Sequence, residues 1–158
     1  MYDNVFSLEQ QLGRIRHRGD GRVQKVRREP EAEECADLVR WARRTTIAGI
    51  RVGDFLTHIP NEGKRGKKAR ADFHRLGGQP GYPDYLLDVA RCGYYGLRIE
   101  AKAPTGGRIT EDQRKWEVRL SGQGYLFAYC YSAEEMKGLI ADYLKGHIEG
   151  PDSGGTAA

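Results

Sequence analysis

The chain has 158 residues, with 26 Lys or Arg against 22 Asp or Glu and a formal net charge of +4. This length suits one domain with one core, and the charge tilts the expectation only mildly toward an anionic partner. No apolar run approaches the roughly 20 residues of a membrane-spanning helix, so we expect none. The three cysteines match no zinc-ligand pattern and the N-terminus has no signal-like apolar stretch, so we expect reduced thiols in a cytoplasmic protein.

The composition of the chain changes at Pro30, from a basic segment with few apolar residues to a predicted amphipathic helix. Residues 1–29 carry seven Lys or Arg against four acids and few apolar side chains, which predicts a basic, loosely docked arm with a short helix near Leu8 to Leu12. Pro30 suits the first turn of a helix. Apolar residues then recur at helical spacing and predict a helix with a core-facing stripe, formed by Cys35, Leu38, Val39 and Ala42.

The middle of the chain predicts strands around a basic helix. Residues 51–59 indicate a strand, and residues 64–75, with six Lys or Arg against one Asp, indicate a helix. The glycine-rich run 77–81 predicts a loop. Two further strands are expected at 85–90 and 97–101, joined as a hairpin.

Two helices and one strand complete the predicted order. Thr110 followed by Gln113 resembles a capping box and starts a helix. The aromatic-rich stretch 124–131 predicts a strand, and Ser132 followed by Glu135 resembles a second capping box at the start of the last helix. This order of helices and strands predicts an α/β fold with a mixed β-sheet flanked by helices.

The domain organisation follows from these elements. We expect a basic N-terminal arm over residues 1–29, one domain over residues 30–146, and a disordered tail over residues 147–158, which is rich in Gly and Ser.

Two neighbouring strands place an acidic pair beside a lysine. Side chains alternate along a strand, so Glu100 and Lys102 share one face. If the hairpin turn centres near Cys92, Asp84 lies opposite Glu100 on that face, whereas a slip of one residue would separate them. Close carboxylates need a cation, and their oxygens suit Mg²⁺ or Mn²⁺. Such an ion with Lys102 beside it is sufficient for phosphodiester hydrolysis, although alternating charges also occur on solvated strands.

Two further positions have open interpretations. Glu31 heads the apolar stripe of the first helix, where a carboxylate needs a partner such as a metal. Glu34 is the competing choice, and both also suit a helix N-terminus. Gln113 lies on the inner face of its helix. It could bond Lys102 or a metal-bound water, or cap the helix by pairing with Thr110, and the two roles are compatible.

Basic residues in and before the predicted helix at 64–75 are candidates for DNA binding. They could neutralise phosphates and make the affinity sensitive to salt, although a solvated helix surface has the same composition. The candidates are Lys64, Arg65, Lys67 and Lys68.

Several short motifs, in this order, resemble the VRR-NUC family of PD-(D/E)xK nucleases. The resemblance runs from His58 to Leu144 and extends to the first helix. The motifs are the turn His58–Gly63, Gly81-Tyr82-Pro83-Asp84, Ile99-Glu100-Ala101-Lys102, Gln113 with Trp116, Gly124-Tyr125, and the helix from Glu31 to Ala42. Cys35 departs from the family, which often has Gln after its first Glu, and this departure leaves both Glu31 and Glu34 as candidates for the first-helix acid.

The resemblance implies a restriction-endonuclease-like fold and a catalytic set. It implies Mg²⁺ or Mn²⁺ bound by Asp84, Glu100 and the carbonyl of Ala101, assisted by Lys102 and Gln113. It favours Glu31 as the first-helix acid, and it adds Asn61, in the turn, to the DNA-binding candidates.

Stand-alone members of this family, from phages and bacteria, look like homodimeric Holliday junction resolvases. We therefore expect a metal-dependent, structure-specific endonuclease that acts on branched DNA, such as Holliday junctions or flaps, as a homodimer. Its expected place is the cytoplasm of a bacterium or of a phage-infected host. The alternatives are a non-catalytic nucleic-acid-binding module and a restriction-type, sequence-specific endonuclease.

Overall fold

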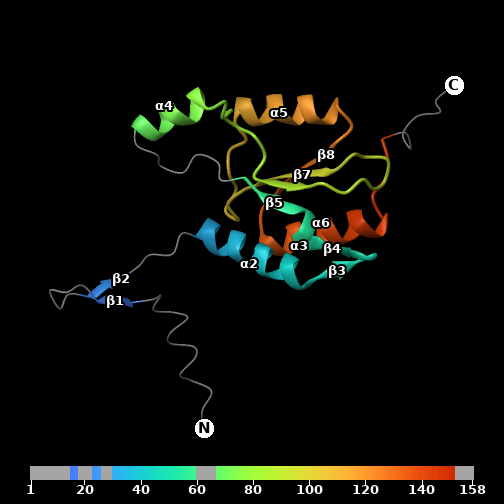
Figure 1. Ribbon diagram of the computed structural model, residues 1–158, viewed down its shortest axis with the longest axis horizontal. Helices are drawn as coiled ribbons and strands as arrows, with labels where there is room; N and C mark the ends of the chain where they lie inside the picture. Colours follow the sequence, from blue (N-terminus) through green and yellow to red (C-terminus); the bar gives the residue numbers. More distant parts are fainter. Residues whose placement is uncertain (1–14, 18–22, 26–29, 60–66, 152–158) are drawn as a thin grey trace, which may run out of the picture. The chain divides into compact units, whose positions relative to one another are not determined.

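The computed structural model describes residues 15–17, 23–25, 30–59 and 67–151 (Figure 1). The chain divides into two compact units, residues 1–33 and residues 34–158. The first unit contains an antiparallel hairpin of β1 (Ile15–His17) and β2 (Val23–Lys25). No pattern in the sequence indicates this hairpin, and the short helix expected near Leu8 to Leu12 lies outside the described residues.

The first predicted helix is confirmed as α2 (Pro30–Arg44). On its apolar stripe Leu38 and Ala42 are buried, and Cys35 is partly buried against the core. The other helices of appreciable length are α4 (Lys67–Arg75), α5 (Glu111–Ser121) and α6 (Ala133–Lys145). Within the described part of the chain, no helix is long and apolar enough to cross a membrane.

The single strand predicted over residues 51–59 is wrong over its first half. Residues 46–58 instead form four short elements: β3 (Thr46–Ile47), β4 (Ile50–Arg51), α3 (Val52–Phe55) and β5 (Leu56–His58). Only β5 agrees with the predicted strand. β3 and β4 form a hairpin whose two loop residues, Ala48 and Gly49, both have positive φ. That backbone is usual for Asn-Gly but rare for alanine, so the sequence lacks the usual turn signal. Val52 is fully buried and anchors the one-turn helix that follows.

One four-stranded mixed sheet organises the second unit. β6 (Tyr85–Leu87) pairs antiparallel with β5 on one side and with β7 (Leu97–Ala101) on the other, and β8 (Leu126–Cys130) pairs parallel with β7. The parallel pair needs a crossover connection, and the chain between them contains α5. The predicted mixed sheet flanked by helices is therefore confirmed.

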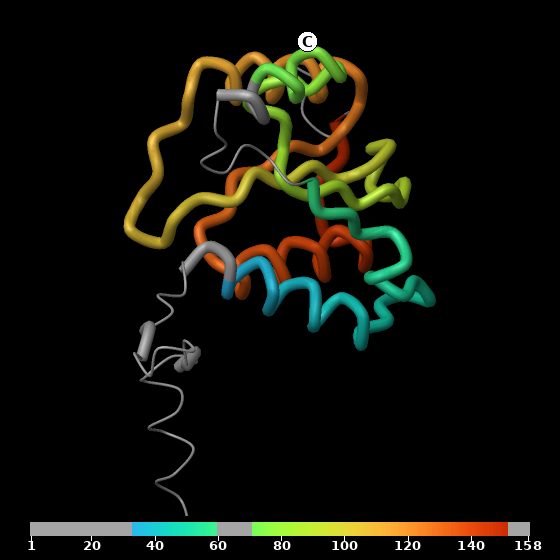
Figure 2. Tube along the Cα trace, turned by 60° about the vertical axis from the view of Figure 1, so that its left-hand side comes forward, coloured from blue at the N-terminus to red at the C-terminus, as the bar shows by residue number. Residues whose placement is uncertain are grey.

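Helices cover both faces of this sheet. α2 and α6 lie along one face, and α4 and α5 lie on the side of the other (Figures 1 and 2). The hydrophobic core lies on the α2 and α6 side, because alternate strand residues point there. Its fully buried members include Leu38, Tyr85, Leu87, Leu97, Ile99, Met136, Ile140 and Tyr143. On α5, by contrast, Leu120 is the one buried residue, so polar contacts are important in holding this helix on the sheet.

Candidate active site

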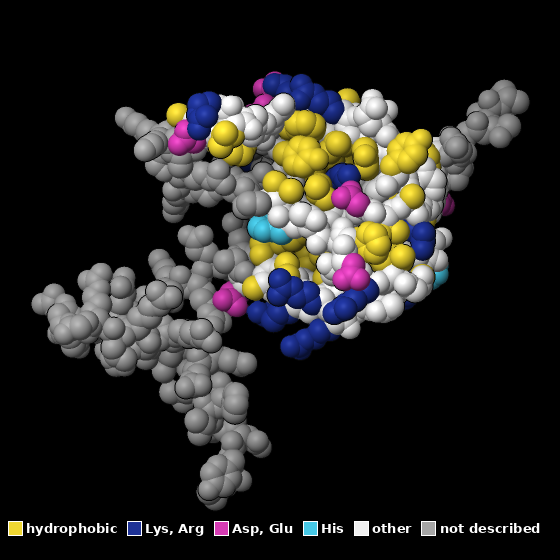
Figure 3. Space-filling view, viewed as in Figure 1, with side chains coloured by type: hydrophobic (Ala, Val, Ile, Leu, Met, Phe, Trp, Pro, Cys, Tyr) yellow, Lys and Arg dark blue, Asp and Glu magenta, His cyan; other side chains and the backbone are white. Residues whose placement is uncertain are grey.

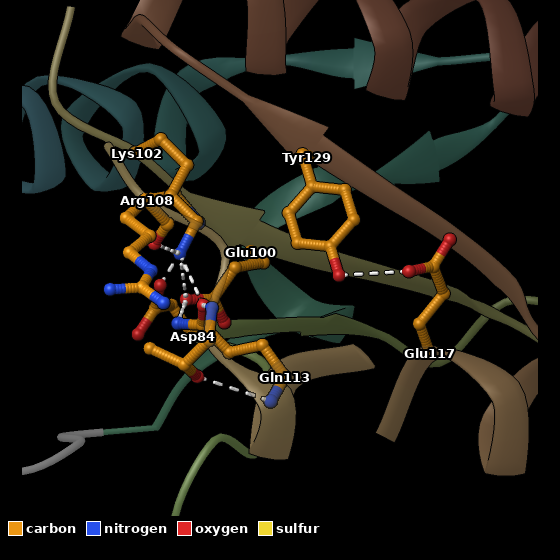
Figure 4. A network of polar contacts seen from close by, with 9 residues as sticks. Asp84, Glu100, Lys102, Arg108, Gln113, Glu117 and Tyr129 are labelled. Atoms are coloured by element: carbon orange, nitrogen blue, oxygen red, sulfur yellow. Dashed lines mark hydrogen bonds and ion pairs between the residues drawn. The ribbon is translucent and has the colours of Figure 1, made fainter. Parts of the chain in front are cut away.

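The strand register brings Asp84 and Glu100 together as predicted. β6 and β7 pair Tyr85 with Ile99, which places Asp84, one residue earlier, across from Glu100. The carboxylate of Asp84 accepts a hydrogen bond from the N–H of Ala101 at 2.9 Å. The backbone carbonyl of Asp84 accepts one from the N–H of Ile59 at 2.7 Å. Asp84 is thus tied to both neighbouring strands, and its carboxylate lies beside Glu100 (Figure 4).

Glu100 is a buried carboxylate with one oxygen still unsatisfied. It is 4% exposed. Its Oε1 accepts hydrogen bonds from Lys102 at 3.3 Å and from the side-chain amide of Gln113, whereas its Oε2 is buried without a hydrogen-bond partner. Burial, and then the charge of Asp84, raise the pKa of Glu100 to about 7, against the opposing effect of Lys102. Without a cation, the site therefore tends to hold a proton.

The ammonium group of Lys102 points into the same site. Its side chain is 6% exposed. Besides Glu100, its Nζ donates to Oε1 of Gln113 at 2.6 Å and to the carbonyl of Arg108 at 3.5 Å. Figure 4 shows these contacts converging on one nitrogen. A buried ammonium surrounded by oxygens is held in one place, as a group that orients a nucleophile requires.

Both interpretations of Gln113 hold in the structure. The side chain of Thr110 accepts from the N–H of Gln113, and Oε1 of Gln113 accepts from the N–H of Thr110 at 2.9 Å, which completes the predicted capping box. The same Oε1 also accepts from Lys102 at 2.6 Å. Gln113 therefore joins the start of α5 to the acidic pair.

A glycine allows α5 to approach the loop that carries Asp84. Gly81 has φ +75°, and a Cβ there would lie 2.6 Å from a backbone atom of Asp112. Next to it, the indole N–H of Trp116 donates to the carbonyl of Pro80 at 3.1 Å, and the ring of Trp116 packs edge-on against Tyr82. These contacts fix the first turns of α5 over the loop, and so set the distance from Gln113 to the acidic pair.

Comparison with known structures assigns this arrangement to a family. The chain is similar to a solved VRR_NUC domain protein, with 28% sequence identity and a TM-score of 0.64, over 77% of this chain and 93% of that one. The chain contains a VRR-NUC domain. This is a nuclease-type domain, and its mixed sheet with flanking helices agrees with the expected restriction-endonuclease-like fold. No protein-family model and no curated protein matches the sequence.

Of the two candidates for the first-helix acid in this VRR-NUC domain, the structure describes the side chain of Glu34 but not that of Glu31. The carboxylate of Glu34 accepts a hydrogen bond from the N–H of Ala133, at the start of α6, where a negative charge suits the helix N-terminus. Glu34 therefore has a structural partner. The backbone of Glu31 is in the first turn of α2, but its side chain lies outside the described residues, so its role stays a prediction.

The predicted DNA-binding residues lie where the side chains are not described. Asn61, Lys64 and Arg65 lie outside the described residues. α4 (Lys67–Arg75) confirms the predicted basic helix from residue 67 to its end. Lys67 and Lys68 are in its first turn, but their side chains lie outside the described residues. The role of all five in binding DNA stays a prediction.

Basic side chains are visible elsewhere on the VRR-NUC domain. In Figure 3 they gather over α5 at the upper edge and along the lower edge of the view. The exposed Lys and Arg residues of α5 are Arg114, Lys115 and Arg119, although Lys115 is paired with Glu111 and Asp112. Because α5 also carries Glu111, Asp112 and Glu117, these three basic side chains give the helix no net positive charge.

Sequence reasoning missed three residues next to the site. The carbonyl of Arg108 accepts from Lys102, and the hydroxyl of Tyr129 donates to Glu117 at 2.9 Å (Figure 4). A register for the parallel pair would have revealed Tyr129, because it lies across from Glu100 on β8. The sequence did not fix that register, since a long crossover separates the two strands.

The residues at this site fit a divalent cation. The unsatisfied Oε2 of Glu100 is a buried acceptor that a cation would satisfy, and the carboxylate of Asp84 lies beside it. Within the described residues there is no group of three or more His, Cys, Asp or Glu side chains that could hold a metal. Mg²⁺ commonly binds to one or two carboxylates and keeps several waters, so two carboxylates agree with such an ion.

Proposed function

We propose that this VRR-NUC domain is an Mg²⁺- or Mn²⁺-dependent endodeoxyribonuclease. The observation that carries the proposal is the buried, unsatisfied Oε2 of Glu100 beside the carboxylate of Asp84. Two carboxylates in a poorly solvated place repel each other. A divalent ion bound between the two carboxylates would offset this repulsion and satisfy the buried oxygen of Glu100.

Asp84 and Glu100 would hold the ion, with the carbonyl of Ala101 as a third ligand. Bound there, the ion would polarise a phosphoryl oxygen and lower the pKa of a coordinated water. Asp84 is held for this role by the N–H of Ala101. Glu31 would complete the acidic cluster from α2.

Lys102 and Gln113 would position the attacking water and the phosphate. The ammonium of Lys102 is fixed between Glu100 and Gln113, where it can hold the water in line with the phosphorus and balance the negative charge that develops in the transition state. The amide of Gln113 already donates to Glu100, so it can donate instead to a water or a phosphate oxygen once Glu100 binds the ion.

The substrate that we propose is branched DNA, cut by a homodimer. The support is the family resemblance together with the size of the domain, because a compact unit of residues 34–158 leaves little room for an element that reads base sequence. The basic residues at 61–68 would contact phosphates. Two copies with active sites facing opposite strands would make paired cuts in a four-way junction.

A cleavage panel tests the proposal. Labelled linear duplex, flap and four-way junction DNA are incubated with the protein in Mg²⁺, in Mn²⁺ or in EDTA. We expect cutting only with a metal, strongest on branched substrates, and its loss in Lys102→Ala with binding largely retained. Binding without cutting of any substrate in either metal would favour a non-catalytic binding module. Cutting of linear duplex at one sequence would favour a restriction-type enzyme.

A further inference from the structure

Tyr129 lies next to the candidate active site and has no part in the chemistry above. On β8 it is in register with Glu100 of β7, so its side chain shares the sheet face of Lys102. Its ring centroid lies 5.8 Å from Nζ of Lys102, within the distance at which an aromatic face attracts a cation. Figure 4 shows the ring beside the lysine and Glu100.

The buried environment of Lys102 strengthens the attraction between its ammonium group and the ring of Tyr129. An ammonium group has three N–H donors, and three oxygens lie within reach: one each from Glu100, Gln113 and Arg108. The ring of Tyr129 is therefore a neighbour that adds attraction without competing for a hydrogen. Because the lysine side chain is 6% exposed, water weakens the attraction little, and cation–π contacts are strongest when desolvated.

Glu117 fixes the ring in place. The hydroxyl of Tyr129 donates to Oε2 of Glu117 at 2.9 Å. Burial, then this hydrogen bond, raise the pKa of Tyr129 above its usual value, so the ring remains a neutral phenol. A phenol that donates to a carboxylate has a more electron-rich ring, which attracts a cation more strongly. Glu117 follows Gln113 by one helical turn on α5, so one helix holds Lys102 directly and through Tyr129.

We propose that Tyr129, held by Glu117, is a positioning residue for Lys102, whose ring keeps the ammonium group at the place where it orients the nucleophile. This inference rests on the proposed nuclease function and adds a residue to its active site. In the alternative role, the Tyr129–Glu117 hydrogen bond only docks α5 on the sheet. The two roles differ in whether the ring or the hydroxyl matters.

Steady-state cleavage by three variants separates these roles. Tyr129→Phe keeps the ring and loses the hydrogen bond, Glu117→Leu loses only the acceptor, and Tyr129→Leu loses both ring and hydrogen bond. We expect kcat to fall about tenfold in Tyr129→Leu and no more than about threefold in the other two, with KM for DNA within about twofold of wild type. Tyr125→Leu, near the start of the same strand, is the matched control and should keep the wild-type kcat.

A measurement that needs no activity completes the test. Carbon–proton NMR spectra report on the ε-methylene group of Lys102, whose signal is assigned by its loss in Lys102→Arg. The ring should shift this signal upfield in wild type and in Tyr129→Phe. In Tyr129→Leu the signal should return to the position usual for lysine. A Phe variant as slow as the Leu variant would overturn the proposal in favour of docking, and an unchanged kcat or lysine signal in Tyr129→Leu would overturn it outright. If wild type cuts no DNA, the proposed function fails, and the lysine signal still shows whether the ring contact exists.

Discussion

Asp84 and Glu100 form a carboxylate pair in which burial of Glu100, and then the charge of Asp84, raise the pKa of Glu100 to about 7. Burial opposes the charged form, and the neighbouring charge adds to this effect. A carboxyl group with a pKa so close to neutrality responds to pH and to cations in a range that is easy to measure.

The stability of the metal-free protein should fall as pH rises from about 4.5 to about 7. The pKa of Glu100 is raised from 4.5 to about 7, so in this window the folded state binds more protons than the unfolded state. Stability that is complete below the unfolded pKa is then lost as pH rises through the folded pKa. The full shift corresponds to about 3 kcal/mol at most. Urea unfolding in EDTA measures it.

Glu100→Gln is the control for this pH dependence. An amide cannot titrate, so the part of the slope between pH 4.5 and 7 that belongs to Glu100 should disappear. Other groups that titrate in this range contribute equally to both proteins. Equal slopes in wild type and Glu100→Gln would contradict the assignment of the raised pKa to Glu100.

Mn²⁺ or Mg²⁺ should stabilise the folded protein at pH 7.5. At this pH Glu100 has mostly lost its proton, and a bound ion would offset the repulsion between the two carboxylates. A ligand that binds only the native state raises its stability by mass action. Asp84→Asn should lose most of the rise in Tm at millimolar Mn²⁺. Asp54→Asn is a matched control, since the side chain of Asp54 is 60% exposed, and it should keep the wild-type rise. A rise that persists in Asp84→Asn would place the ion elsewhere.

Gly81 should tolerate a side chain far less well than Gly77. Both have positive φ, +75° and +87°, so alanine meets similar backbone strain at either position, about 1 kcal/mol. A Cβ at Gly77 has nothing within 4 Å, whereas at Gly81 it would lie 2.6 Å from backbone of Asp112. We expect Gly81→Ala to lower the free energy of unfolding by about 1–3 kcal/mol more than Gly77→Ala does. Equal losses in urea unfolding would contradict the close packing of α5 on this loop.

The sequence predicted those parts of the site that depend on local rules. The pairing of Asp84 with Glu100 followed from a hairpin of two short strands, in which one assumed turn centre fixes every opposed pair. The capping box of Thr110 and Gln113 followed from residue types at fixed spacing. Both are confirmed because only neighbouring segments decide them.

The parts that the sequence did not predict depend on distant segments. The first half of the strand expected over residues 51–59 is replaced by the end of a hairpin and a helical turn, because burial of Val52 and the positive φ of Ala48 outweigh local strand preference. Tyr129 lies by Lys102 only because β8 pairs in parallel with β7 after a crossover of about two dozen residues. No local pattern specifies such a pairing.

Gln113 should prove to have two separable roles. Gln113→Ala removes both its half of the capping box and its contacts with Lys102 and Glu100. Thr110→Ala removes only the other half of the box, because the N–H of residue 110 still donates to Gln113. Each variant should lose about 1 kcal/mol of stability, measured by urea unfolding. Cleavage kinetics should show a fall in kcat of at least about tenfold in Gln113→Ala alone, because that variant releases the ammonium of Lys102. If Thr110→Ala lowers kcat equally, the helix cap explains the activity and Gln113 has no direct part in holding Lys102.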